Sequence, residues 1–406
     1  NNSITEISYE ISDLFTDVDN LWEVVYKMQK DMDNMTEEID EMTSEMEEMQ
    51  ERINELENMT SCRLVPYSNC AGADFNNTNL SGMDLTGINL EGADLSYVNL
   101  SNATLDYARL NNVEFTGSNL TGATFAFTEI NFGRMKNTVL VDSYFGYADL
   151  KNIRLGYSDL TGASLYHADL TDANFLDADL INANLNYADL TRAYFYAADL
   201  EDATLYAADL EEANLYGADL TGADFRHADL TNAKVILADL TNANFEGADL
   251  RYANFDFSRL KFANFNFTDL TDASFFDSNL TDVNFRGADL EDASLAYADL
   301  TRANLISANL KDASLYDADL TNADLSYADL TNADFQDADL TGANLNYADL
   351  TNADFQDADL EDATLSEADL KFAKFSGATV TDANFDDTYW HETMWTNGVR
   401  YDSNQA

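Results

Sequence analysis

A five-residue register runs through most of the chain and decides what it can fold into. From Phe75 to Phe385 every fifth residue is Leu or Phe, which gives 63 units without an insertion or deletion. The exceptions are Ile130, Met135, Val235 and Val380. Two residues before each of these positions stands a small residue, most often Ala. Neither the period of a helix nor that of a strand fits. The pattern predicts a turn in every unit, with both positions pointing to a common axis.

The units follow the pattern Ala-(Asp/Asn)-Leu-x-x, as in Ala-Asp-Leu-Thr-Asn at 328–332 and Ala-Asp-Phe-Gln-Asp at 333–337. This pattern resembles the pentapeptide-repeat family over about three quarters of the chain. The resemblance implies an all-β, right-handed quadrilateral β-helix, a solenoid with four units in each coil. The 63 units then give just under 16 coils. At the roughly 4.8 Å spacing of neighbouring strands, these coils form a rod of about 75 Å.

The first 58 residues carry a different repeat, in which apolar residues recur at alternating spacings of three and four. Eight such heptads predict a long α-helical coiled coil in front of the β-helix, and so narrow an apolar stripe requires a partner helix. We therefore expect a parallel homo-oligomer, and the sequence leaves two and three strands open. The predicted oligomerisation residues are Ile4, Ile7, Ile11, Leu14, Val18, Leu21, Val25, Met28, Met32, Met35, Ile39, Met42, Met46, Met49, Ile53 and Leu56.

A junction separates the two repeats and contains the only proline, Pro66, and both cysteines. Cys62 and Cys70 are too few for a structural zinc site, so we predict a disulfide, either within one chain or between chains of the oligomer. The alternative is two free thiols in a reducing cytosol. The predicted domains are a coiled-coil stalk (1–58), the junction (59–72), the β-helix (73–387) and a C-terminal aromatic cap or tail (388–406).

Two segments depart from the repeat. We expect the C-terminal segment to seal the last coil, with the alternative of a subunit-docking surface, through Trp390, Trp395 and Tyr401. Between Phe125 and Phe145 the consensus weakens, which indicates drift within the repeat, a local bulge or a partner site. The basic residues that cluster there are Arg134, Lys136 and Arg154.

The charge balance excludes several functions. The chain has 75 acidic and 21 basic residues, a formal net charge of −54. This charge repels phosphate backbones and anionic lipids, which argues against direct binding of nucleic acid. It favours a halophilic source, because molar salt screens the self-repulsion over about 3 Å. No stretch approaches the roughly 18 apolar residues of a membrane span.

Aspartates that precede the inward Leu are predicted to form two columns on opposite faces of the rod. Neighbouring carboxylates about 4.8 Å apart would repel each other by about 1 kcal/mol in water. We expect this repulsion to be offset either by high salt or by weak binding of several Ca²⁺ or monovalent ions. We expect no other cofactor. One column contains Asp159, Asp179, Asp199, Asp219 and Asp239, and the other contains Asp169, Asp189, Asp209, Asp229 and Asp249.

Ten N-x-[ST] sequons predict glycosylation if the protein is secreted. Their asparagines are Asn1, Asn34, Asn58, Asn76, Asn79, Asn99, Asn102, Asn119, Asn266 and Asn279. Outward tyrosines could form sugar-binding or lateral packing strips, with ordinary surface filling as the simpler interpretation. These are Tyr157, Tyr187, Tyr297, Tyr327 and Tyr347.

No catalytic constellation is present, and we expect no enzyme. His167 and His227 lie 60 residues apart, which puts them about 14 Å apart on one face and too far from each other to share a metal. The sequence favours an extracellular structural or surface protein: an oligomeric, glycosylated rod that assembles into a filament, fibre or spike, end to end or through its coiled coil. We expect it on the surface of a halophilic prokaryote or its virus. The alternative is a DNA mimic, like the pentapeptide-repeat proteins that act on type II topoisomerases.

Overall fold

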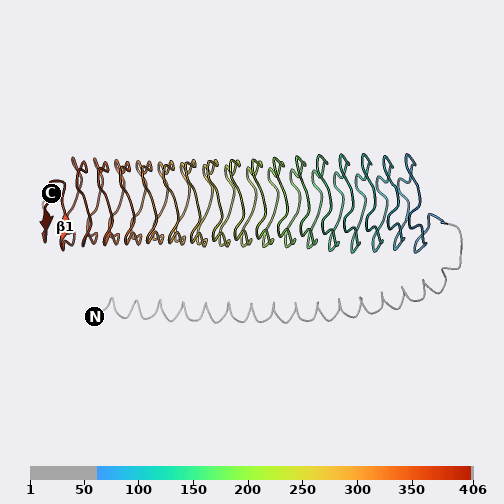
Figure 1. Ribbon diagram of the computed structural model, residues 1–406, viewed down its shortest axis with the longest axis horizontal. Coiled ribbons are helices and arrows are strands. Elements are labelled where there is room, and N and C mark those ends of the chain that lie inside the picture. Colours follow the sequence, from blue (N-terminus) through green and yellow to red (C-terminus); the bar gives the residue numbers. More distant parts are fainter. Residues whose placement is uncertain (1–61, 404–406) are drawn as a thin grey trace, which may run out of the picture. The chain divides into compact units, whose positions relative to one another are not determined.

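A computed structural model of the protein describes residues 62–403, and these residues wind into one continuous helix of short turns (Figure 1). The coiled-coil prediction for residues 1–58, including its oligomerisation residues, lies outside the described part and stays a prediction. Two short strands at the carboxyl end, β1 (Thr393–Met394) and β2 (Arg400–Tyr401), pair in antiparallel fashion. The rest of the ladder consists of isolated parallel bridges between coils.

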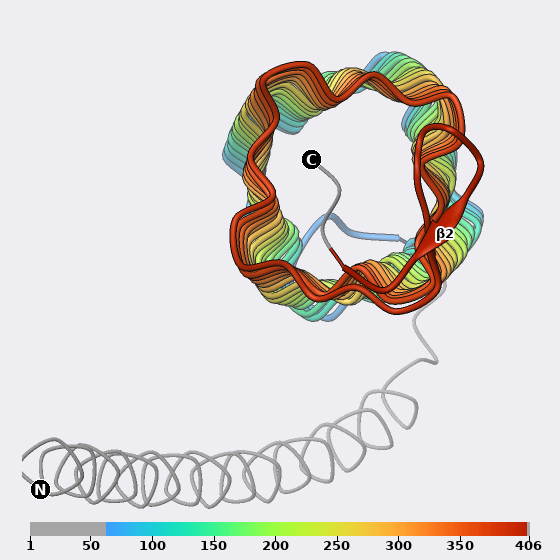
Figure 2. The same cartoon turned by 90° about the vertical axis from the view of Figure 1, so that its left-hand side faces the viewer.

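Each five-residue unit contains one β-turn. In a representative unit, the N–H of Ala93 donates to the carbonyl of Leu90 at 2.9 Å, which closes the turn. Gly92, the third residue of this turn, has a φ of 66°. Left-handed backbone at this position is typical of a type II turn and suits Gly, Asn and Asp. The same position recurs in every unit and forms a corner, so that the coils have a four-sided outline (Figure 2).

Hydrogen bonds between coils fix the length of each coil at 20 residues. The N–H groups of Leu90 and Gly92 donate to Arg109 and Asn111 in the next coil, both at 2.8 Å, and the N–H of Asp94 donates back to Ala73 at 2.9 Å. Bridges join residue pairs such as Asp94 and Glu114, always 20 positions apart. The coil length implied by the family resemblance is therefore confirmed.

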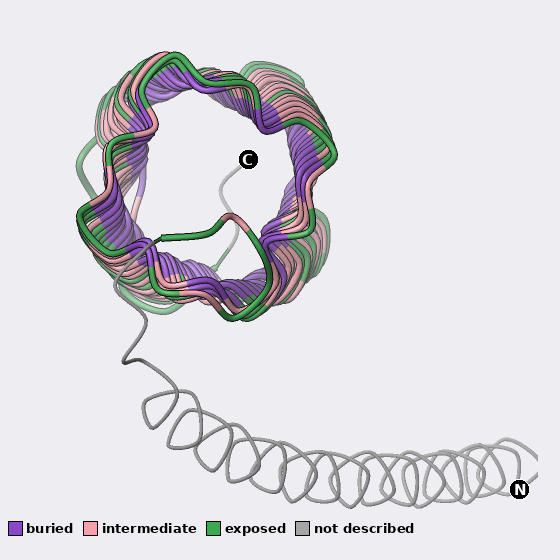
Figure 3. Cartoon of the chain, turned by 90° about the vertical axis from the view of Figure 1, so that its right-hand side faces the viewer, coloured by how far each residue is buried: buried purple, intermediate pink, exposed green. Residues whose placement is uncertain are grey.

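The interior is a ladder of large and small side chains, as the register predicts (Figure 3). Leu100, Leu200 and Leu300 have no exposed surface, and away from the two ends the alanines two positions before the inward residues are also buried. Stacked phenylalanines such as Phe125 and Phe145 have ring centroids 4.6 Å apart, which matches the spacing of neighbouring strands. Because the core excludes water along its whole length, it leaves no channel through the rod.

Hydroxyl residues replace Ala at several buried positions without disturbing the ladder. The hydroxyl of Ser118 donates to the carbonyl of Leu95 at 2.6 Å, and that of Ser143 donates to Leu140 at 2.6 Å. A buried hydroxyl bonded in this way avoids the cost of an unpaired polar group. The bridges continue unbroken through the segment where the consensus weakens, as between Val139 and Asp159. The local bulge considered for this segment is therefore absent.

The β-helix begins before residue 73, so the predicted boundary lies a few residues too late. Asn69 bridges Asn89, and Cys70 occupies an inward position with 2% of its surface exposed. Cys70 is bonded to Cys62 within the chain, with their Cα atoms 4.8 Å apart. The disulfide therefore ties the start of the described chain to the first inward position.

An aromatic cap closes the carboxyl end. The predicted boundary at 387 cuts through this end, because Tyr389 bridges Asp369 and Met394 bridges Lys374. The ring centroids of Trp390 and Trp395 are 5.0 Å apart. The ring centroid of Trp395 lies 5.2 Å from that of Phe385, the last inward phenylalanine. Both tryptophans expose less than a tenth of their surface. Of the two predicted roles, their burial fits the cap and leaves little ring surface for docking a subunit.

The ladder predicts how the core responds to substitution at Phe255. Phe255→Leu should lower the free energy of unfolding by only about 1 kcal/mol, because Leu215 and Leu295 occupy the same position two coils away on either side. Phe255→Ala should lower it by about 3–5 kcal/mol, because the rigid ladder cannot close the cavity. Urea denaturation followed by circular dichroism would measure both. Equal losses for the two variants would contradict a ladder that accepts either large side chain.

Candidate functional site

The two acidic columns are the most extensive candidate site, and the predicted alignment is present. Isolated parallel bridges join Asp159 to Asp179 and Asp199 to Asp219 in one column. Asp189, Asp209 and Asp229 follow one another in the other column. Members of the two columns are ten residues apart, which is half of a coil, so the columns lie on opposite faces.

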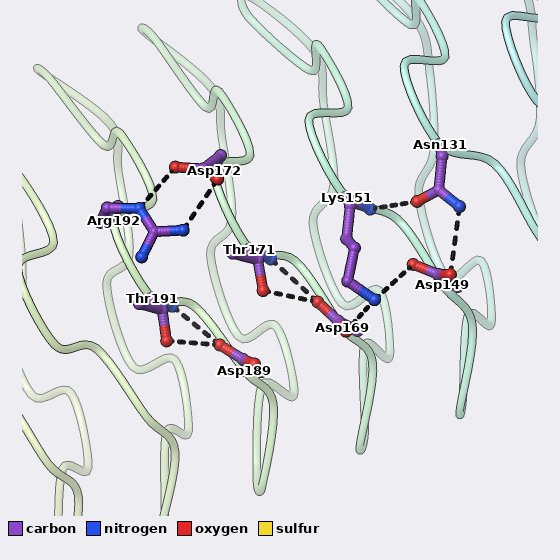
Figure 4. A network of polar contacts seen from close by, with 9 residues as sticks. All are labelled: Asn131, Asp149, Lys151, Asp169, Thr171, Asp172, Asp189, Thr191 and Arg192. Atoms are coloured by element: carbon purple, nitrogen blue, oxygen red, sulfur yellow. Dashed lines mark hydrogen bonds and ion pairs between the residues drawn. The ribbon is translucent and has the colours of Figure 1, made fainter.

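The carboxylates of these columns have a structural role that the sequence analysis missed. The backbone N–H of Thr191 donates to Oδ1 of Asp189 at 3.0 Å, and its hydroxyl donates to the same atom at 2.7 Å (Figure 4). Asn279 accepts the same two bonds from Thr281, at 3.1 and 2.7 Å. At these positions the turn therefore uses a side-chain oxygen, which Asn supplies as well as Asp, and not a negative charge. The recurring Asp-Leu-Thr sequence was the signal for it.

Basic residues bridge the acidic columns in places. The ammonium of Lys151 lies 3.2 Å from Asp149 and 2.5 Å from Asp169, one coil apart in the same column (Figure 4). Burial raises the pKa of Asp169, but hydrogen bonds from Lys151 and Thr171 outweigh it, and the pKa is lowered. Arg251 pairs with Asp249 at 2.6 Å. This hydrogen bond lowers the pKa of Asp249.

The middle of this column lacks such pairs. No ion pair of residues 62–403 involves Asp189, Asp209 or Asp229. These three carboxylates follow one another at the coil spacing, and no ion pair within the described residues offsets their mutual repulsion.

The described residues offer no metal centre. No group of three His, Cys, Asp or Glu side chains between 62 and 403 is placed to hold an ion. His167 is stacked between Tyr147 and Tyr187, with ring centroids 5.0 and 4.8 Å away. Burial in this stack lowers the pKa of His167, which favours its neutral form. Weak binding of cations along the acidic columns stays a prediction.

Stacked rings form an aromatic column on another edge of the rod. Its centroids are 4.8–5.3 Å apart and its ring planes lie within 9° of one another, through Tyr107, Phe127, Tyr147, His167 and Tyr187. Tyr327 and Tyr347 stack in the same way, 4.8 Å apart. Stacking covers the ring faces on which a sugar would lie and turns the edges outward. For Tyr187, Tyr327 and Tyr347 this arrangement speaks against sugar binding. Tyr157 and Tyr297 have no stacked ring within the described residues, so the argument does not extend to them.

The predicted basic cluster lines a shallow hollow. Arg134 and Arg154 are bridged neighbours in one column, and Arg134 pairs with Glu114 at 3.5 Å. The ammonium of Lys136 lies 4.8 Å from the ring centroid of Tyr157, an arrangement that a cation–π contact stabilises. The hollow opens where Gly156 presents no side chain between these groups. Three cations at one place are unusual for so acidic a chain.

Seven of the predicted glycosylation sites lie in the described part. Five of their asparagines are exposed: Asn76, Asn79, Asn102, Asn119 and Asn279. Asn99 and Asn266 are half-buried. The side-chain oxygen of Asn266 is buried without a hydrogen-bond partner. The exposed sites are therefore the better acceptors, while Asn1, Asn34 and Asn58 lie outside the described residues.

A family comparison accounts for the repeat. The model for pentapeptide repeats matches a series of segments between residues 68 and 389, which together cover most of this range. The chain belongs to the pentapeptide-repeat family. Its members form right-handed β-helices, which confirms the β-helical part of the predicted fold. Adjacent matches end at residue 131 and resume at 138, so the repeat model skips the segment that contains Arg134 and Lys136.

Several solved structures resemble this pentapeptide-repeat protein. HetL, involved in heterocyst differentiation regulation in the cyanobacterium Nostoc sp. strain PCC 7120, is 26% identical, with 68% of this chain and 93% of HetL covered and a TM-score of 0.28. A pentapeptide repeat protein from the Arabidopsis thaliana thylakoid lumen is 32% identical. The match covers 30% of this chain and 68% of that protein, with a TM-score of 0.19. QnrB1, a plasmid-mediated fluoroquinolone resistance protein, is 17% identical, with 46% and 89% covered and a TM-score of 0.25. None of the curated proteins compared matches the chain. Similarity at this level carries no information on function.

The acidic column predicts different effects on stability for replacement of its aspartates by Asn and by Ala. Replacing Asp189, Asp209 and Asp229 together by Asn should raise the melting temperature at millimolar salt, because each turn keeps its oxygen acceptor while the repulsion disappears. The gain should vanish in molar salt. Replacing the same three by Ala removes the repulsion and the acceptors together. At either salt concentration the Ala variant should be less stable than the Asn variant by about 1 kcal/mol for each lost acceptor, and in molar salt it should be less stable than the native chain. Calorimetry at both salt concentrations would measure these changes, and an Asn variant without the low-salt gain would refute the repulsion.

Proposed function

We propose that the protein is a non-enzymatic structural rod on the outside of a cell or virus particle. One observation carries the proposal: the ladder of coils runs from Asn69 to Met394 without an inserted loop. A binding or catalytic protein of this size usually places its working residues on loops held by a rigid scaffold. Between Asn69 and Met394 the chain builds only the scaffold, and every connection is a turn of the repeat.

The junction and the sequons support an extracellular location. Cys62 and Cys70 form a disulfide, a bond that persists mainly in oxidising compartments. The five exposed sequon asparagines offer sites for N-linked glycans in a secreted protein. The coiled coil predicted for residues 1–58 would join two or three rods in parallel.

The acidic surface supports a saline environment. The net charge of −54 imposes self-repulsion that is screened over about 3 Å in molar salt. Bridging cations such as Lys151 and Arg251 relieve part of this repulsion. The unpaired part favours a source in which salt supplies the remaining screening.

DNA mimicry is the second candidate, and the acidic columns favour it. The same surface also argues against it. A mimic of the phosphate backbone would be expected to stay negative along its length, but residues 131–170 carry as many basic as acidic side chains. This stretch includes the basic hollow of Arg134, Lys136 and Arg154. The repeat also lacks the inserted loops with which some topoisomerase-acting relatives engage their enzyme.

Electron microscopy of the native surface and of the purified full-length chain tests the proposal. We expect rods that project from the envelope, and an intact mass above that of the bare chain where glycans are attached. A DNA-supercoiling assay with a type II topoisomerase serves as the counter-test. Inhibition at stoichiometric concentrations, together with a protein found only inside the cell, would overturn the structural role.

A further inference from the structure

One coil of the rod carries an aromatic ring at each of its four corners. The four residues occupy the left-handed turn position, with φ values between 57° and 62°. They expose 47–65% of their surface, more than most large apolar side chains of the rod. We call this set the aromatic girdle: Tyr252, Phe257, Phe262 and Phe267. No other coil within residues 62–403 has aromatic residues at four consecutive corners.

The girdle rings differ from the stacked aromatic column because their faces are not covered by rings of adjacent coils. The corners of the next coil are Asp272, Asp277, Asp282 and Gly287. Phe267 leans over Gly287, where an added Cβ would lie 2.8 Å from its ring. Phe257 meets a ring only edge-on, that of Phe276 at 5.6 Å. Apolar surface is thus left open around the circumference.

The girdle coil also departs from the charge of the rod. Residues 251–270 contain three basic and two acidic side chains, which makes this coil net positive. When the coils are counted in steps of 20 from residue 71 to 390, all of the remaining coils are neutral or negative. The ammonium of Lys261 lies 4.8 Å from the ring centroid of Phe262. Exposed rings and a loss of negative charge therefore coincide at one level of a strongly acidic shaft.

We propose that the aromatic girdle is a lateral contact through which parallel copies of this chain pack side by side, in register. This inference rests on the proposed structural role and on its predicted parallel stalk. Four exposed rings gathered at one level of the rod are more apolar surface than isolated surface residues provide, and such a concentration favours an interaction site. Because the rings face all four sides, a flat partner would cover only part of them, whereas neighbouring rods meet a ring whichever face they present.

Register follows from what lies above the girdle. Parallel copies at the same height bring ring against ring. A shift by one coil would press the rings against Asp272, Asp277 and Asp282, and would take these carboxylates out of water. Each contact buries only one or two corners and is weak alone. A parallel stalk would raise the effective concentration of the second rod and so make a weak contact sufficient.

The contact should strengthen with salt. Salt screens the repulsion between two acidic rods, while apolar burial persists and is reinforced by ions excluded from protein surfaces. A contact based on ion pairs would weaken under the same change. The sign of the salt dependence therefore separates a girdle contact from a charge-driven one.

The test uses the full-length chain with all four girdle residues replaced by Asp. Asp already occupies the same corner in the next coil, at Asp272, Asp277 and Asp282, so the change suits the turn. The matched control is Tyr327→Asp with Tyr347→Asp, which removes two exposed corner rings that stack on each other. Circular dichroism checks that both variants keep the native fold.

Two measurements are made on each protein, in millimolar and in molar salt. Sedimentation gives the mass of the oligomer, and a spin label on Asp292→Cys gives the distance between copies by electron spin resonance, since the described residues contain no free cysteine. The native chain and the control should show a population of short distances between labels, and the girdle variant should lose at least 80% of this population at unchanged mass.

Each outcome decides a different point. A short distance that survives in the girdle variant, or is lost equally in the control, would overturn the lateral contact alone. A contact that weakens as salt rises would overturn it as well. A native chain that sediments as a single copy at all concentrations would overturn both the contact and the proposed oligomeric rod.

Discussion

The backbone hydrogen bonds of the repeat are the constraint on which the rest of the structure depends. In the unit from Leu90 to Asp94 every N–H is used: three bond to neighbouring coils, one closes the turn, and one is taken by the side chain of Asn89. A chain that satisfies its backbone in this way leaves the outward side chains free of any role in main-chain pairing, except at the turn position filled by Asp or Asn. The surface can therefore vary from coil to coil while the frame stays constant.

Because the frame does not depend on most outward side chains, much of the fold could be predicted from the sequence. The five-residue period places Leu100 and its neighbours on the axis, because no other backbone brings every fifth side chain to one line. The coil length came from the family resemblance and is set physically by pairs such as Asp94 and Glu114. The ends were harder. Cys70 and Met394 join the ladder although neither carries the consensus residues, since the bonding pattern of the adjacent coil accepts any side chain that fits.

The candidate surfaces could be predicted only in part. Reading the sequence in steps of 20 aligned Asp189 with Asp209. The role of each carboxylate in its own turn became visible only from the structure, which shows the hydroxyl of Thr191 donating to Asp189. The hollow beside Arg154 depends on a missing side chain at Gly156, in a column that no local pattern reveals. The coverage of ring faces likewise depends on which residue stands one coil above, so that Tyr147 and Phe267 look equivalent in sequence and differ in space.

Charge and apolar exposure on this rod are best understood together. A uniformly acidic shaft keeps copies apart at every height, and screening alone gives them no reason to meet at one height rather than another. The girdle coil carries no net negative charge and has four exposed rings, so it favours contact at its own height. Burial of apolar surface has no preferred direction, but it stabilises contact only where apolar surface is present. The cost of placing rings at left-handed corners, where Asn or Gly would be easier, is then offset by contact between copies. In this view the acidic coils prevent association out of register, and the girdle determines where association occurs.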